Sequence, residues 1–133
     1  MIRSHKLVGG FCKALAGGIV LLVMFAGAGP LFAGSTCYVW TAGADMSPYD
    51  TWGDAANDIQ TAVDYAVANY PAFDTVVVTN GAYPQVNVPV QITGPITLRS
   101  VNGQEYTTIW RQSSVDDTQA VYIAHNGAVV DGF

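Results

Sequence analysis

Thr75-Val-Val-Val-Thr-Asn-Gly81 is the stretch that decides the fold, because two later runs of the chain repeat its pattern. These runs are Thr97-Leu-Arg-Ser-Val-Asn-Gly103 and Val121-Tyr-Ile-Ala-His-Asn-Gly127, and the steps between their asparagines are 22 and 24 residues. Each run favours a β-strand and stops at Asn-Gly, a pair that tolerates positive φ and turns the chain. Self-similarity at such a period is typical of solenoids, so the sequence predicts three successive rungs of a parallel β-solenoid.

Short strands are also expected around these runs, at 36–41, 107–110 and 128–130, because they are rich in β-branched and aromatic residues. Residues 86–92 alternate between apolar and polar positions, the pattern of a half-buried strand, which Pro89 shortens or makes irregular. In the second run the same alternation places Leu98 in the core and Arg99 outside. In the third run the alternation is offset by one residue relative to Asn-Gly, which a small insertion or a bulge would explain.

One helix is predicted ahead of the first run. Its apolar stripe follows the helical period and consists of Ile59, Ala62, Val63, Ala66 and Val67. Thr51-Trp-Gly-Asp54 matches a capping signature, although Asp54 or Asn57 fits the cap position equally well, and Pro71 stops the helix. We expect this helix to cover the open end of the apolar core and to block edge-to-edge strand pairing there.

Residues 1–33 have the pattern of a secretory signal peptide, with basic residues first, an apolar stretch next and a small residue, Ala33, at the cleavage position. An uncleaved membrane anchor is the alternative, because the apolar run is about as long as a bilayer requires. Export to the medium or the cell surface follows from the first interpretation. Cys12 would leave with the signal, so Cys37 would be the only thiol, and we expect it to be a small buried residue.

The charge distribution excludes some partners. Only Arg99 and Arg111 are basic after Ala33, whereas all ten acidic residues follow it, so residues 34–133 carry a formal charge of −8. Nucleic acid requires clustered Lys and Arg, and so do anionic membranes, which argues against both as partners.

Acidic side chains are the first candidates for chemistry. Asp116-Asp117, together with Asp45, Asp50 and Asp54, have the chemistry of glycosidase acids or calcium ligands. No recognised calcium pattern is present, so solvated loop acids are the favoured interpretation. No catalytic, metal or cofactor residue is therefore assigned, and calcium stays an expectation only for a longer protein.

The remaining candidates are also better explained by structural roles. Arg99 and Arg111 suit a lyase base or, next to Trp110, a sugar contact, but neither has a matched second residue. His125 has no partner at metal or nucleophile spacing, so it is expected in a turn. The asparagines of the three Asn-Gly pairs are expected to stack as an internal ladder. Aromatic residues that suit a carbohydrate platform or the core are Tyr38, Trp40, Tyr49, Trp52, Tyr65, Tyr70, Tyr83, Tyr106, Trp110 and Tyr122.

A family resemblance rests on the order of these motifs. An export signal is followed by Tyr38-Val39, by Trp52 before the helix, and by the runs 74–83, 95–103 and 127–133. Over residues 36–133 the chain resembles the N-terminal end of bacterial right-handed parallel β-helix proteins of the pectin-lyase-like superfamily. The resemblance implies that catalytic residues would lie on central coils beyond residue 133, so none is carried over.

The sequence therefore predicts an all-β protein: a signal peptide (1–33), then an N-terminal capping helix and the first coils of a right-handed parallel β-helix (34–133). Because Asp131-Gly-Phe133 has no capping element, we expect a fragment of a longer solenoid whose own further coils are partners. The expected function is a cell-surface or extracellular scaffold, adhesive or carbohydrate-binding, with extracellular polysaccharide as partner. The alternative is the N-terminal part of a polysaccharide lyase or glycoside hydrolase. A truncated gene product with no separate function is a third hypothesis.

Overall fold

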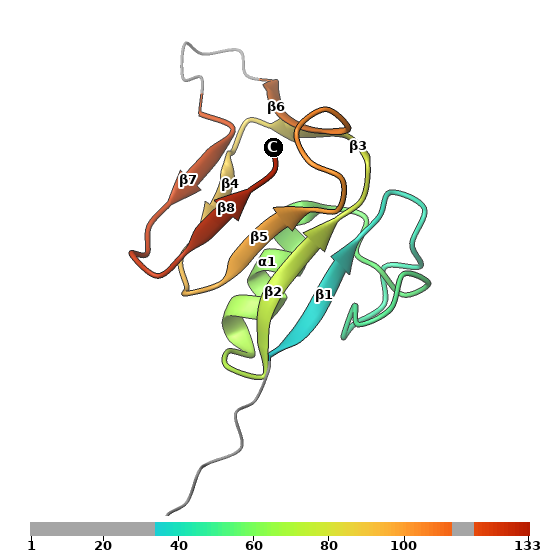
Figure 1. Ribbon diagram of the computed structural model, residues 1–133, viewed down its shortest axis with the longest axis vertical. Helices are drawn as coiled ribbons and strands as arrows, with labels where there is room; N and C mark the ends of the chain where they lie inside the picture. Colours follow the sequence, from blue (N-terminus) through green and yellow to red (C-terminus); the bar gives the residue numbers. More distant parts are fainter. Residues whose placement is uncertain (1–33, 113–118) are drawn as a thin grey trace, which may run out of the picture. The chain divides into compact units, whose positions relative to one another are not determined.

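The computed structural model describes residues 34–112 and 119–133. The predicted signal peptide, Cys12 and Asp116-Asp117 lie outside the described residues. The described chain is mostly β-strand with one helix (Figure 1). The elements in chain order are β1 (Ser35–Val39), α1 (Ile59–Ala68), β2 (Phe73–Val78), β3 (Gly81–Val86), β4 (Val90–Ile92), β5 (Thr97–Ser100), β6 (Thr107–Gln112), β7 (Val121–Ile123) and β8 (Val129–Asp131).

The strands of the described chain pair in parallel and form three short sheets. β2, β3 and β4 each belong to a different sheet, and β5, β6 and β7 then pair with them in the same order. β8 returns to β5, and β1 lies on the other side of β2, which gives the sheet order β1-β2-β5-β8 (Figure 1). The chain therefore makes two circuits through the same three sheets and begins a third.

The third Asn-Gly run does not occupy the predicted place. The first two runs are neighbours as expected, with Thr75 beside Thr97. Val121–Ile123, however, forms β7 and pairs with β4, whereas the neighbour of β5 is β8, in which Val129 lies beside Thr97. The prediction of three equivalent rungs is thus wrong for the third run. Its one-residue offset arises because it belongs to another sheet, and no bulge is needed to explain it.

The predicted strand over 86–92 is interrupted in the middle. β3 ends at Val86, and Asn87 has a φ of 65°, a left-handed conformation that turns the chain before β4 begins. Val86 and Val88 are consequently 60% and 54% exposed, although the alternation placed them inside. Beyond Pro89 the predicted pattern holds, because Val90 and Ile92 are fully buried.

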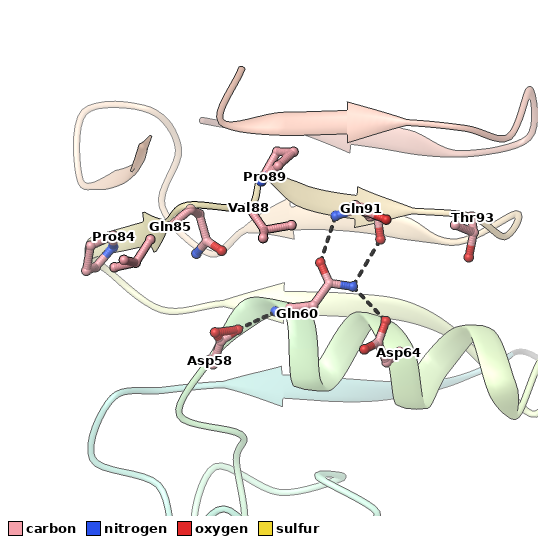
Figure 2. Close-up of a pocket in the computed structure, with 10 residues that line it drawn as sticks. Asp58, Gln60, Asp64, Pro84, Gln85, Val88, Pro89, Gln91 and Thr93 are labelled. Carbon is pink, nitrogen blue, oxygen red and sulfur yellow. Dashed lines mark hydrogen bonds between the residues drawn. The ribbon is translucent and has the colours of Figure 1, made fainter. Parts of the chain in front are cut away.

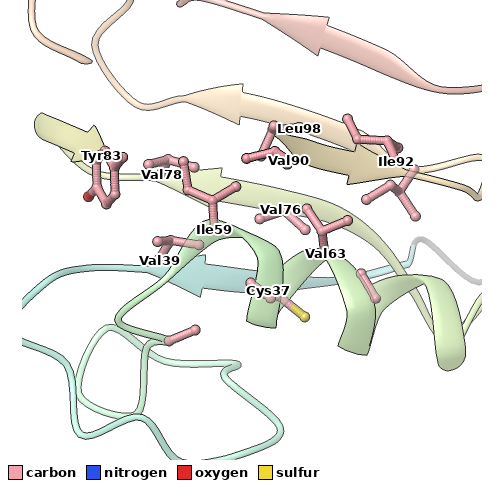
Figure 3. Close-up of a cluster of buried hydrophobic side chains, with 14 residues drawn as sticks. Cys37, Val39, Ile59, Val63, Val76, Val78, Tyr83, Val90, Ile92 and Leu98 are labelled. Atoms are coloured by element: carbon pink, nitrogen blue, oxygen red, sulfur yellow. The ribbon is translucent and has the colours of Figure 1, made fainter. Parts of the chain in front are cut away.

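The hydrophobic core lies between the sheets and one face of α1 (Figure 3). Leu98 is fully buried and Arg99 is exposed, which confirms the predicted orientation of the second run. Of the predicted helical stripe only Val67 is not fully enclosed. The largest fully buried side chains are Ile59, Ile92, Ile96, Leu98, Val39, Val63, Val76, Val78, Val90, Thr107 and Cys37.

Helix α1 begins later than its predicted cap. Asp58 is the N-cap residue, and its Oδ1 accepts a hydrogen bond from the Gln60 backbone N–H at 2.6 Å. The Thr51 hydroxyl instead accepts from the Asp54 N–H at 3.1 Å and donates to the Asp54 carboxylate at 2.8 Å. The capping signature is therefore used in a turn of the preceding loop, because the same side-chain chemistry stabilises both structures.

Helix α1 and the loop of residues 40–57 cover the N-terminal side of the sheets. Helix α1 packs on β1, β2 and β4, which confirms that it covers the core. The free edge of β1 is covered by the loop of residues 40–57, where the Tyr38 N–H donates to Tyr49 O at 2.7 Å and the Ala56 N–H donates to Tyr38 O at 2.9 Å. The helix blocks an edge at β4, where Gln91 N donates to the Gln60 Oε1 at 2.7 Å. The predicted edge protection is thus divided between the helix and the loop.

Candidate functional site

The outer face of the β1-β2-β5-β8 sheet brings together residues that lie far apart in the sequence. Beyond the last residues of β1 and β2, the Thr79 N–H donates to Val39 O at 3.0 Å and the Val101 N–H donates to Val78 O at 2.9 Å. The strand register therefore continues to a row formed by Trp40, Thr79 and Val101. Because Val39 and Val78 point into the core, alternation places this row on the outer face.

Trp52 comes to the same place from the loop of residues 40–57. Its ring packs on Tyr38 of β1, with ring centroids 4.3 Å apart and planes inclined by 53°. Trp40 and Trp52 remain 40% and 38% exposed. Together they line a shallow groove of about 430 Å³. We call it the tryptophan groove, and its lining residues are Trp40, Trp52, Thr79, Asn80, Val101 and Asn102.

Two of the three Asn-Gly asparagines meet at this groove. The Asn102 Nδ2 donates to the Asn80 Oδ1 at 2.8 Å, which confirms the predicted bond between these two amides, but the predicted internal position is wrong because the bond lies on the surface. Asn126 does not belong to the predicted ladder, because it follows β7 rather than a strand of the β1-β2-β5-β8 sheet. Asn80 and Asn102 are both exposed. They present amide groups that donate and accept hydrogen bonds beside the indole rings.

Thr79, which lines the groove, is bonded to the buried Tyr83. Their hydroxyl oxygens are 2.8 Å apart, and the Tyr83 hydroxyl donates to Thr79 O at 3.2 Å. Burial raises the pKa of Tyr83, against a smaller lowering by the Thr79 hydrogen bond. The phenol therefore stays protonated at neutral pH. The lining residues of the groove themselves offer uncharged hydrogen-bonding groups and apolar ring faces.

A second groove of about 530 Å³ lies between α1 and the edges of β3 and β4 (Figure 2). Its central side chain is Gln60, whose Nε2 donates to Gln91 O at 3.2 Å and to the Asp64 Oδ1 at 2.6 Å. These bonds hold the helix against β4, and the described residues that line this groove include no aromatic ring. Its polar groups thus have a structural use, whereas those of the tryptophan groove border exposed aromatic surface.

The acidic candidates of the loop before α1 mostly serve that loop. The Asp45 Oδ1 lies 3.4 Å from the Asn57 N–H, Asp54 is bonded to Thr51, and Asp50 is exposed. Within residues 34–112 and 119–133, no three His, Cys, Asp or Glu side chains gather as a metal site would require.

The two arginines occupy different settings. Arg99 is exposed on the outer face and lies in register with Asp131 of β8. The Arg111 guanidinium donates to Asn87 O at 2.8 Å and to Gln119 O at 3.2 Å, so it stabilises the bend between β3 and β4. Trp110 and Arg111 are consecutive in β6 and point to opposite faces. They do not form the joint sugar contact considered from the sequence.

His125 and Cys37 have the structural roles predicted for them. The His125 Nδ1 accepts a hydrogen bond from the Gly127 N–H at 3.0 Å within the turn before β8. Cys37 is fully buried, and burial together with the nearby Asp50 carboxylate raises the pKa of its thiol to about 12. Such a thiol is protonated and unreactive at neutral pH.

Comparison with family models, with curated proteins and with solved structures finds no match to this chain. In the part of the chain that the structure describes, no helix is long and apolar enough to cross a membrane. The sequence analysis named Trp40 and Trp52 among the aromatic residues but missed that both line one groove. The one indication in the sequence was that Trp40 comes two residues after Tyr38, which places both side chains on the same face of a strand.

Proposed function

We propose that residues 34–133 form the capped N-terminal end of an exported right-handed parallel β-helix. Its role would be that of an extracellular or cell-surface scaffold that is adhesive or carbohydrate-binding. The observation that carries this proposal is the repeated course of the chain, in which β5, β6 and β7 retrace β2, β3 and β4. Parallel strands joined by a crossover within one sheet follow a right-handed path in about 98% of cases, and β2 and β5 are joined in this way.

The strand edges are covered on one side of the sheets and uncovered on the other, which supports further coils as the partner of the uncovered side. On one side, α1 and the loop of residues 40–57 cover the core and two strand edges. On the other side, β6, β7 and β8 have no second strand neighbour among the described residues. Ile109, Val121, Val130 and Phe133 are only partly buried there. Another coil would pair with these edges and complete the burial of these side chains.

The scaffold role is favoured over the lyase or hydrolase alternative by the contacts of the candidate residues. Arg111 binds two backbone carbonyls, and His125 binds the backbone of its own turn. Both are thus engaged in maintaining bends of the chain. The predicted signal peptide is consistent with an exported protein.

The test is to read the coding DNA beyond Phe133 and to locate the natural product. We expect further strand-and-turn repeats of about 20–35 residues and a mature protein in the medium or at the cell surface that begins near Gly34. Clusters of Asp, Arg or Lys at one-coil spacing would instead support the enzyme. A cytoplasmic product that retains Met1, or a continuation without such repeats, would overturn the proposal.

A further inference from the structure

We propose that the tryptophan groove binds a neutral polysaccharide chain that runs across the strands, from β1 towards β5. This inference rests on the proposed carbohydrate-binding role and assigns it a site and a class of ligand. The residues that make the site are Trp40, Trp52, Asn80 and Asn102.

The aromatic part of the groove is suited to the C–H face of a sugar ring. Trp40 and Trp52 are each more than a third exposed, and both line the same groove. Trp52 is held in place by its contact with Tyr38, so its ring is ordered before a ligand arrives. Large apolar rings fixed in advance lower the entropy lost on binding.

The polar part of the groove is suited to hydroxyl groups. The bond between Asn80 and Asn102 uses one oxygen and one nitrogen, which leaves the Asn80 Nδ2 as a donor and the Asn102 Oδ1 as an acceptor. A sugar hydroxyl donates and accepts at once, so it complements such a pair of amides. A few fixed polar groups beside apolar surface are the usual composition of a ligand site.

The charge of the surroundings selects a neutral ligand. Among the residues that the structure describes, no acidic or basic side chain lines the groove. Arg99, two residues before Val101 on the same face, lies in register with the acidic Asp131. Residues 34–133 carry a formal charge of −8, which repels a polyanion such as a galacturonate chain.

The orientation follows from the register of the sheet. Trp40, Thr79 and Val101 form one row across β1, β2 and β5. Asn80 and Asn102 each lie one residue beyond it, so the lining residues follow a line across the strands. Neighbouring strands are about 4.8 Å apart, close to the length of one pyranose unit. A β-1,4-linked chain laid along this line would place successive sugars on successive strands.

The experiment is a titration of the natural protein with cellohexaose, xylohexaose and mannohexaose, followed by tryptophan fluorescence. We expect at least one of these neutral β-1,4-linked chains to change the emission with saturation, and hexagalacturonate to bind more weakly. Trp40→Ala and Trp52→Ala should each lower the affinity by about tenfold or more, since aromatic anchors dominate binding. Trp110→Ala is the matched control, because Trp110 is 43% exposed on another sheet, and it should retain the affinity of the unchanged protein.

Trp52→Phe keeps a ring against Tyr38, so it should fold normally and retain more affinity than Trp52→Ala. The inference is overturned if none of the three neutral chains binds, if hexagalacturonate binds more tightly, or if Trp110→Ala weakens binding as much as Trp40→Ala. Any of these results would leave the exported β-helix scaffold standing, because cellular location and the downstream coding sequence test that proposal independently.

Discussion

Replacing Gln60 with alanine tests whether a helix side chain takes the place of a neighbouring strand at the edge of β4. The Gln60 Oε1 accepts from Gln91 N at 2.7 Å, and its Nε2 donates to Gln91 O at 3.2 Å and to Asp64 at 2.6 Å (Figure 2). A hydrogen bond in a folded protein contributes about 0.5–1.5 kcal/mol net. Because these groups stay accessible to water after the substitution, we expect a loss of about 1–2 kcal/mol in the free energy of unfolding.

The assay is urea unfolding followed by tryptophan fluorescence and far-UV circular dichroism. Gln91→Thr is the matched control, because only the backbone of Gln91 takes part in the contact. It should lower the free energy of unfolding by less than about 0.5 kcal/mol. The reasoning is refuted if Gln60→Ala is as stable as the unchanged protein, or if Gln91→Thr destabilises it equally.

Three further predictions concern the core and the bend. Leu98→Ala should destabilise the protein by about 2–5 kcal/mol in the same urea assay, whereas the exposed Arg99→Ala should have little effect; equal losses would contradict the described orientation. Val88→Thr should be nearly neutral and Ile92→Thr strongly destabilising in thermal unfolding, because only Ile92 is buried; the reverse order would refute the bend at Asn87. In a Cys12→Ser chain, Cys37 should resist a disulfide reagent at pH 8 until urea is added. Burial raises the thiol pKa of Cys37 from 9.0 to about 12. The thiol's contribution to the free energy of unfolding is therefore complete below pH 9 and is lost as the pH rises towards 12. Fast labelling of the native protein, or a free energy of unfolding that does not fall between pH 9 and 12, would disprove this.

Local sequence patterns predicted where the strands and the helix lie better than they predicted which strands pair. The runs at Thr75 and Thr97 pair as expected because both the strand pattern and the spacing agree. The run at Val121 has the same Asn-Gly ending but belongs with β4. Asn-Gly signals a turn in any sheet, so it does not identify which sheet the preceding strand joins. That depends on circuit length, which changes from 22 residues between Thr75 and Thr97 to 32 between Thr97 and Val129.

The tryptophan groove could not be predicted from local sequence patterns, for a related reason. Trp52 reaches Tyr38 only because the loop of residues 40–57 folds back on β1. This return depends on a close approach at Gly43, where any side chain would collide with the Ala55 carbonyl. Loop closure of this kind leaves no period in the sequence, whereas the stripe of α1 and the alternation in β5 do.

The most direct test of the account is the strand neighbour of β7, measured from cross-strand nuclear Overhauser effects in an isotope-labelled protein. The two-circuit course predicts contacts between residues 90–92 and 121–123, and between residues 97–99 and 129–131. Contacts of residues 121–123 with residues 97–100 instead, as strict repetition of the Asn-Gly runs requires, would contradict the three-sheet course of the chain.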